Sequence, residues 1–163
     1  MPRIYRVPYT GTLAAGDGDS DLLSIQPADD HPCEIVGWLL GQSSEFGDVQ
    51  EEDLRLTLRH MTATVTIGSG GSAVTPVNNR PGTAENAAAG FTARCNDTTV
   101  STTSGTSVIA EELAWNVRST PWERFIPDEV RPLAIQGEVL IVRNETTVAD
   151  NVTVNLTFLV REW

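Results

Sequence analysis

Lysine is absent from this chain: all 11 basic residues are arginine, against 22 acidic residues. The formal net charge of -11 repels nucleic acid and anionic membranes, so the composition argues against binding to either. The exclusive use of arginine has two explanations. Arginine suits bidentate pairing with carboxylates at semi-buried contacts, and a GC-rich codon bias would produce the same composition.

Cysteine and long apolar runs are also scarce. The two cysteines, Cys33 and Cys95, do not make a disulfide framework. No apolar run approaches the length of a membrane span, and residues 1–11 lack an apolar core long enough for a signal peptide. We therefore expect synthesis in the cytoplasm, with both thiols free.

Helix patterns are nearly absent, and alternating runs of Thr and Val, typical of strands, take their place. Strands are predicted at 3–9, 22–26, 33–42, 53–67, 91–99, 107–118, 133–143 and 152–161. About eight strands with long loops between them predict an all-β, two-sheet antiparallel sandwich with a jelly-roll-like topology. The length fits one domain, with residues 1–16 as an N-terminal strand or arm and 17–163 as the sandwich.

Three segments have a more specific interpretation. In 53–67 the apolar alternation slips by one residue, which predicts a β-bulge near Arg59 and His60. Residues 68–90 are rich in Gly, Ser, Pro, Asn and Ala and are predicted to form a long loop, either an exposed insertion or an arm that crosses to a neighbour. Residues 119–132 hold three prolines and several large apolar side chains, so we expect an ordered connection.

Possible metal ligands form incomplete sets. Asp17, Asp19 and Asp21 have the spacing that begins an EF-hand loop, but the glycine and glutamate that should follow are missing. A solvated acidic turn is the simpler interpretation, and a looser calcium site remains an alternative. His31 and Cys33 lie close in sequence, yet zinc requires more soft ligands than these provide. We therefore predict no metal site.

Catalytic patterns are similarly incomplete. The segment 68–72 lacks the Lys-Ser/Thr of a phosphate-binding loop and is predicted to be a flexible linker. A Cys–His pair is conceivable, but nothing in the sequence around either cysteine prepares a thiolate. Carboxylates at 51–53 and 111–112 leave a hydrolase as an alternative, although adjacent carboxylates on a strand point to opposite faces. We predict no catalytic residues, no cofactor and no enzymatic activity.

Two groups of residues are candidate contacts with a partner or a sister subunit. Their members are Arg3, Tyr5, Arg6 and Tyr9 near the N-terminus, and Trp122 and Phe125 in the proline-rich connection. A basic, aromatic segment on an acidic chain can bind an acidic surface of a partner, and aromatic residues are enriched at interface cores. The alternatives are an ordinary edge strand for the first group and a cap over the sandwich core for the second.

Several motifs together resemble small β-rich proteins encoded by bacteriophages and prophages. The motifs are Leu-Gly-Gln-Ser-Ser at 40–44, Glu-Glu-Asp-Leu-Arg-Leu at 51–56, Gly-Ser-Gly-Gly-Ser-Ala-Val-Thr-Pro at 68–76, Ala-Ala-Gly-Phe-Thr-Ala at 88–93, Asn-Asp-Thr-Thr at 96–99, Trp-Asn-Val-Arg at 115–118 and Glu-Val-Arg-Pro at 129–132. The chain is similar in size and in its β-rich sequence pattern to phage head-decoration (cement) proteins, which are often β-rich trimers bound to a capsid.

The resemblance implies a structural virion protein that binds the major capsid protein as a homotrimer on the outside of a phage head and stabilises it. The alternative is a lectin-like sandwich that binds carbohydrate or a receptor, with Trp122 and the 68–90 loop forming the recognition face.

Overall fold

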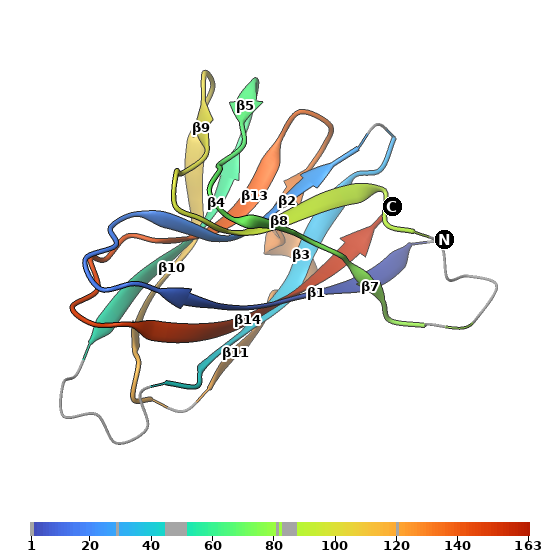
Figure 1. Ribbon diagram of the computed structural model, residues 1–163. Coiled ribbons are helices and arrows are strands. Elements are labelled where there is room, and N and C mark those ends of the chain that lie inside the picture. The colour runs from blue at the N-terminus through green and yellow to red at the C-terminus, as the bar shows by residue number, and fades with distance from the viewer. Residues whose placement is uncertain (1, 29, 45–51, 81, 83–87, 120) are drawn as a thin grey trace.

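The computed structural model describes residues 2–28, 30–44, 52–80, 82, 88–119 and 121–163. Its strands form two antiparallel sheets that lie face to face as two layers (Figure 1). Sheet A has the order β11 (Trp122–Phe125), β3 (Cys33–Gln42), β14 (Val152–Glu162), β1 (Arg3–Leu13) and β7 (Val77–Asn78), with β12 (Leu133–Ala134) also paired to β3. Sheet B has the order β10 (Ser107–Asn116), β4 (Asp53–Met61), β13 (Val139–Asn144), β2 (Ser20–Pro27), β8 (Phe91–Asp97) and β6 (Ser72–Val74). The strands β5 (Val65–Thr66) and β9 (Thr102–Thr103) form a separate ribbon, and a 3-10 helix, η1, spans Asp128–Val130.

Eight of these strands form four antiparallel pairs that are nested in sequence, each pair lying between the two strands of the pair before it. The outermost pair is β1 with β14, followed inward by β2 with β13, β3 with β11, and β4 with β10. Successive pairs alternate between sheet A and sheet B. This is the jelly-roll arrangement, so the predicted all-β sandwich is confirmed.

The core lies between the sheets and follows the period-two pattern of the strands. In β14 every second residue from Val152 to Glu162 is buried, as the sequence predicted for the apolar ones. The largest fully buried side chains in the continuous apolar cluster are Trp38, Tyr5 and Phe158. Burying one such side chain stabilises a fold by roughly 1.5–3 kcal/mol.

The apolar alternation in 53–67 changes phase because a second, smaller core lies on the outer face of sheet B. There Met61 packs with Val139 and Ile141, beneath Val65 and Ile67 from the segment that holds β5. The prediction of one strand over 53–67 with a bulge near Arg59 and His60 is therefore wrong. β4 ends at Met61 with an unbroken register to β13, and the bulge lies in β10, between Ile109 and Glu111.

The prediction of a single strand over 133–143 is also wrong. β12 pairs with β3 in sheet A, whereas β13 pairs with β2 and β4 in sheet B. Between them the amide of Glu138 donates to the carbonyl of Ile135 at 3.1 Å. Gly137 has a φ of 84° in this turn, a conformation that favours glycine.

The Gly-rich segment after β5 adds a strand to each sheet. β6 pairs with β8 in sheet B, and β7 pairs with β1 in sheet A. The predicted long loop at 68–90 thus contains two short strands, and its residues 81 and 83–87 lie outside the described residues. The flexible linker predicted at 68–72 is instead bound to the sheet: the amide of Gly71 donates to Asp97 Oδ1 at 3.0 Å, and Ser69 pairs with Thr99.

Candidate docking edge

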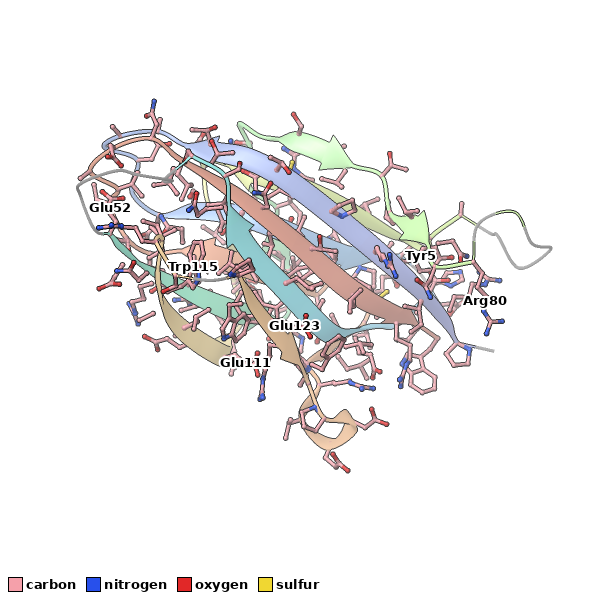
Figure 2. All side chains as sticks on the ribbon, turned by 90° about the horizontal axis from the view of Figure 1, so that it is seen from below. Tyr5, Glu52, Arg80, Glu111, Trp115 and Glu123 are labelled. Atoms are coloured by element: carbon pink, nitrogen blue, oxygen red, sulfur yellow. The ribbon has the colours of Figure 1, made fainter. Side chains whose placement is uncertain are left out.

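The open edges of the two sheets meet on one side of the sandwich. β10 is the last strand of sheet B, and β11 and β12 lie beyond β3 in sheet A. Glu111 of β10 connects them, since its carboxylate accepts hydrogen bonds from the indole of Trp38 at 3.1 Å and from Nε of Arg124 at 3.0 Å. Figure 2 shows Glu111 and Glu123 close together at this margin. We call β10 together with residues 122–135 the docking edge.

Large apolar side chains are concentrated along this edge. Of the eight that are exposed among the described residues, six belong to it: Val108, Ile109, Phe125, Val130, Leu133 and Ile135, with exposed fractions of 39–64%. Single exposed apolar residues are ordinary on a protein surface, whereas a group of them along one edge marks a contact with a partner. The edge therefore has the composition of an interface.

A polar bridge connects the far ends of β10 and the β12 segment. Glu138 accepts a hydrogen bond from the amide of Ile135 at 3.1 Å and pairs with Nε2 of His60 at 2.9 Å. His60 lies opposite Val108 in the β4–β10 ladder. Glu111 and Glu138 thus connect the two parts of the docking edge, β10 and residues 122–135, at two points. We call the exposed apolar residues of these two parts the apolar strips.

Trp122 lies between two hollows at the same edge. The larger, about 510 Å³, is lined by Trp38, Glu111, Glu112, Leu113, Trp122, Glu123 and Arg124. The smaller, about 240 Å³, is bounded by Pro121 and by residues of β3 and β14. The Trp122 ring meets the buried Trp38 ring edge to face, with centroids 4.6 Å apart, so the wall between the hollows is firmly packed.

The surroundings of the apolar strips are acidic. Among the described residues Glu123 and Glu129 have no ion-pair partner, while Arg124 is paired with Glu111, and Arg131 is shared between Glu34 and Asp128. Each positive charge at the edge therefore already has a carboxylate beside it. An apolar surface with an acidic surround is complementary to an apolar, basic partner surface.

A charged network on the outer face of sheet B is paired with the docking edge at Glu112. Arg55 contacts Glu112 at 2.6 Å and Glu145 at 2.7 Å, and Glu145 also pairs with Arg59. Burial by itself would raise the pKa of Glu145. Hydrogen bonds from Arg59 and Thr57, together with the charges of Arg59 and Arg55, outweigh burial and lower that pKa below its usual value.

The predicted N-terminal contact residues lie elsewhere, in a strand of the sandwich itself. β1 pairs with β14 from Arg3 opposite Glu162 to Leu13 opposite Val152, so residues 3–13 are not a separate arm. Tyr5 is 1% exposed and Tyr9 is 6% exposed, and both belong to the core. Their prediction as contacts is wrong, because the alternation of β1 turns them inward.

The remaining predicted contacts are split between two places. Arg6 is exposed, and Arg3 pairs with Glu162 at 3.3 Å, both on β1. Trp122 and Phe125 lie on β11, with β3 and β14 between that strand and β1. Trp122 is half-buried against Trp38, as the cap interpretation predicts, whereas Phe125 is 56% exposed. The predicted contacts on β1 and on β11 are therefore separated by two strands and do not form one surface.

Sequence reasoning missed the rest of the docking edge. The missed apolar residues are Val108, Ile109, Val130, Leu133 and Ile135. The uncharged run at 107–110 was the available signal, but an apolar strand reads the same at the middle of a sheet as at its edge.

The acidic turn and the cysteines serve structural roles. Asp17 accepts a hydrogen bond from the amide of Ala14 at 2.9 Å, whereas buried Asp21 pairs with Arg143 at 2.6 Å, so these carboxylates diverge. No cluster of three or more metal-binding side chains occurs in the part of the chain that the structure describes. Burial, with a smaller contribution from Glu162, raises the pKa of Cys33 to about 12, and burial also raises that of Cys95.

The paired carboxylates considered for a hydrolase also diverge. Glu111 faces Trp38 and Arg124, while Glu112 faces Arg55. Glu52 accepts a hydrogen bond from the amide of Ala149, and Glu51 lies outside the described residues.

Comparisons with protein-family models, with curated proteins and with solved structures found no match to this chain. Among the described residues, no helix has the length and apolar character needed to cross a membrane.

Proposed function

We propose that this chain is a structural virion protein without catalytic activity, which decorates the outside of a phage head and stabilises it. It is made in the host cytoplasm and binds the major capsid protein through the docking edge. The observation that carries the proposal is the group of six exposed apolar residues along β10 and 122–135. A surface of this kind is costly to leave in water and is expected to be covered by another protein.

Reinforcement would arise from surface buried across the seams between capsomers. Internal genome pressure tends to open these seams, and a contact burying roughly 1,600 Å² in total is enough for a stable, specific interface. The net charge of -11 keeps such a protein away from the packaged DNA and suits the particle exterior.

Trimer formation would multiply this contact. Three linked subunits engage three sites at once, which raises the overall affinity without any new contact. Sedimentation equilibrium of the purified chain tests this part of the proposal: a mass of three chains supports it, and a single-chain mass at all concentrations contradicts it.

The function is tested with phage particles assembled with and without this protein. Particles that carry it should retain their DNA after heating or osmotic shock that empties particles without it. Equal robustness of the two preparations, or absence of the protein from purified particles, would contradict the proposal.

A carbohydrate- or receptor-binding module is the second candidate function. It is favoured by a polar hollow between β2, β8 and the segment Ile67–Ser69, which shares no lining residue with the hollows at Trp122. The recognition face predicted from Trp122 and the 68–90 loop is therefore divided between two separate places.

A further inference from the structure

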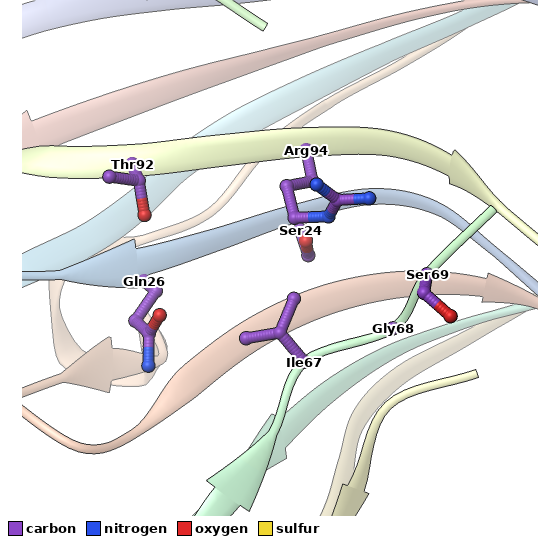
Figure 3. Close-up of a pocket in the computed structure, with 7 residues that line it drawn as sticks. All are labelled: Ser24, Gln26, Ile67, Gly68, Ser69, Thr92 and Arg94. Atoms are coloured by element: carbon purple, nitrogen blue, oxygen red, sulfur yellow. The ribbon is translucent and has the colours of Figure 1, made fainter. Parts of the chain in front are cut away.

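The polar hollow on the outer face of sheet B has the features of a built ligand site. It is an open hollow of about 350 Å³, lined by Ser24, Gln26, Ile67, Gly68, Ser69, Thr92 and Arg94. Figure 3 shows the side chains of β2 and β8 on one side of it and Ile67 on the other. Ser24 lies opposite Arg94, and Gln26 lies opposite Thr92, in the ladder that forms the floor.

The hydrogen-bonding groups of this hollow are unused. Among the described residues, the side chains of Ser24, Gln26, Ser69 and Thr92 make no hydrogen bond within the protein. Arg94 commits Nε and Nη2 to Asp97, at 3.0 and 2.6 Å, and leaves Nη1 without a protein partner. Polar residues from β2, β8 and the segment Ile67–Ser69 therefore line one space with donors and acceptors to offer.

The wall of the hollow is fixed by a buried network behind it. The amide of Gly68 donates to Ser101 Oγ at 2.9 Å, and the amide of Ser101 donates to Asp21 at 2.6 Å. Asp21 also pairs with Arg143, which in turn donates to the carbonyl of Ser101 at 2.8 Å. A side chain at position 68 would meet the Thr99 carbonyl at 2.6 Å, so only glycine fits there. A site held in this way is organised before a ligand arrives.

We propose that this hollow binds a neutral, polyhydroxylated ligand, a sugar residue. Hydroxyl and amide groups both donate and accept, as sugar hydroxyls do. The charge of Arg94 is balanced by Asp97, and the net charge of -11 opposes an anionic ligand. Ile67 supplies an apolar contact for the C–H face of a sugar ring. This proposal rests on the second candidate function and is independent of capsid docking, because the hollow shares no lining residue with the docking edge.

The test is a glycan array that carries neutral oligosaccharides beside their sialylated and sulfated forms, probed with the full chain. The strongest neutral hit is then measured by titration calorimetry as the free oligosaccharide, with free hexoses in parallel to separate a glycan chain from a soluble sugar. We expect neutral glycans to bind and their charged counterparts to bind more weakly. No neutral hit, or hits among charged glycans alone, would overturn the proposal.

Matched variants tie any binding to this hollow. Gln26→Ala with Thr92→Val should weaken it at least about tenfold, since two hydrogen bonds to the ligand are lost. Gln136→Ala with Thr147→Val removes the same groups at exposed positions outside the lining of the hollow and should leave it unchanged. Thr92→Val alone, at an exposed strand position, serves if the double variant melts early. Equal binding by a folded pocket variant would place the sugar elsewhere and overturn the assignment.

Discussion

Two buried tyrosines of β1 differ in one hydrogen bond. The hydroxyl of Tyr5 donates to the carbonyl of Ala88 at 3.3 Å, whereas the buried hydroxyl of Tyr9 has no partner among the described residues. Burial, with a smaller contribution from Cys95, raises the pKa of Tyr9. A buried hydroxyl without a partner costs free energy, so its removal should stabilise the fold.

Tyr9→Phe should therefore raise the free energy of unfolding by about 1 kcal/mol, and Tyr5→Phe should lower it by a similar amount. Urea denaturation of both variants measures the two changes. If Tyr9→Phe destabilises the protein as much as Tyr5→Phe does, the Tyr9 hydroxyl has a hydrogen-bond partner, which contradicts the prediction.

Glu145 makes stability depend on pH. Its folded-state pKa is lowered, so the stabilisation is present above the unfolded pKa near 4.5 and is lost as pH falls through the lower folded value. Glu145→Gln should cost about 1–2 kcal/mol at neutral pH. Denaturation curves at about pH 7 and about pH 3 should show the difference from wild type shrinking in acid. A difference that is constant or grows in acid would contradict the sign.

Among the elements, the sequence predicted strands best where they are covered between the sheets. In β14 one face is apolar throughout, and burial follows that alternation residue by residue. The strand predictions failed at the small outer core of sheet B and at the turn between β12 and β13. Met61 continues an apolar pattern, but it serves the small outer core with Val139 and Ile141 rather than the main one. Residues 133–143 were predicted as one strand because the turn at Gly137 is short and separates two apolar segments, β12 and β13.

The position of the segment between β4 and β10, which holds β5 to β9, depends on one buried ion pair. The Asp21 side chain is fully buried against Arg143, and both bind Ser101 in the segment between β8 and β9. Asp21→Ala would leave a buried guanidinium unpaired and should cost about 3–5 kcal/mol. Faster amide exchange in residues 66–76 and 98–103 should accompany this loss. Arg3→Ala, which breaks a half-exposed pair with Glu162, is the milder control; equal effects of the two variants would contradict the special role of Asp21.

For the molecule as a whole, the sequence predicted the fold, but of the docking edge it predicted only Trp122 and Phe125. The alternating strands specify a two-sheet sandwich, yet the edge depends on which strands end each sheet. Val108 and Ile109 have the sequence of a buried strand, yet both are exposed on β10, the last strand of sheet B among the described residues. Tyr5 and Tyr9, in contrast, have the composition of a contact surface but face inward.

Charge placed on the docking edge should abolish association with particles. Ile109→Asp with Phe125→Asp replaces two exposed apolar residues and should reduce copies per particle at least about tenfold, because interface cores depend on few residues. The thermal midpoint should stay near that of wild type. Val77→Asp alters an exposed apolar residue of β7, away from the edge, and should bind normally. Normal loading of the edge variant would exclude this surface.

Hydrogen exchange of the particle-bound protein against the free protein tests the docking edge most directly. We expect slower exchange on binding in residues 107–116 and 122–135, with little change in β1 and β7. Protection confined to β1, β7 or the outer face of sheet B, with the docking edge exchanging as it does in the free protein, would contradict it.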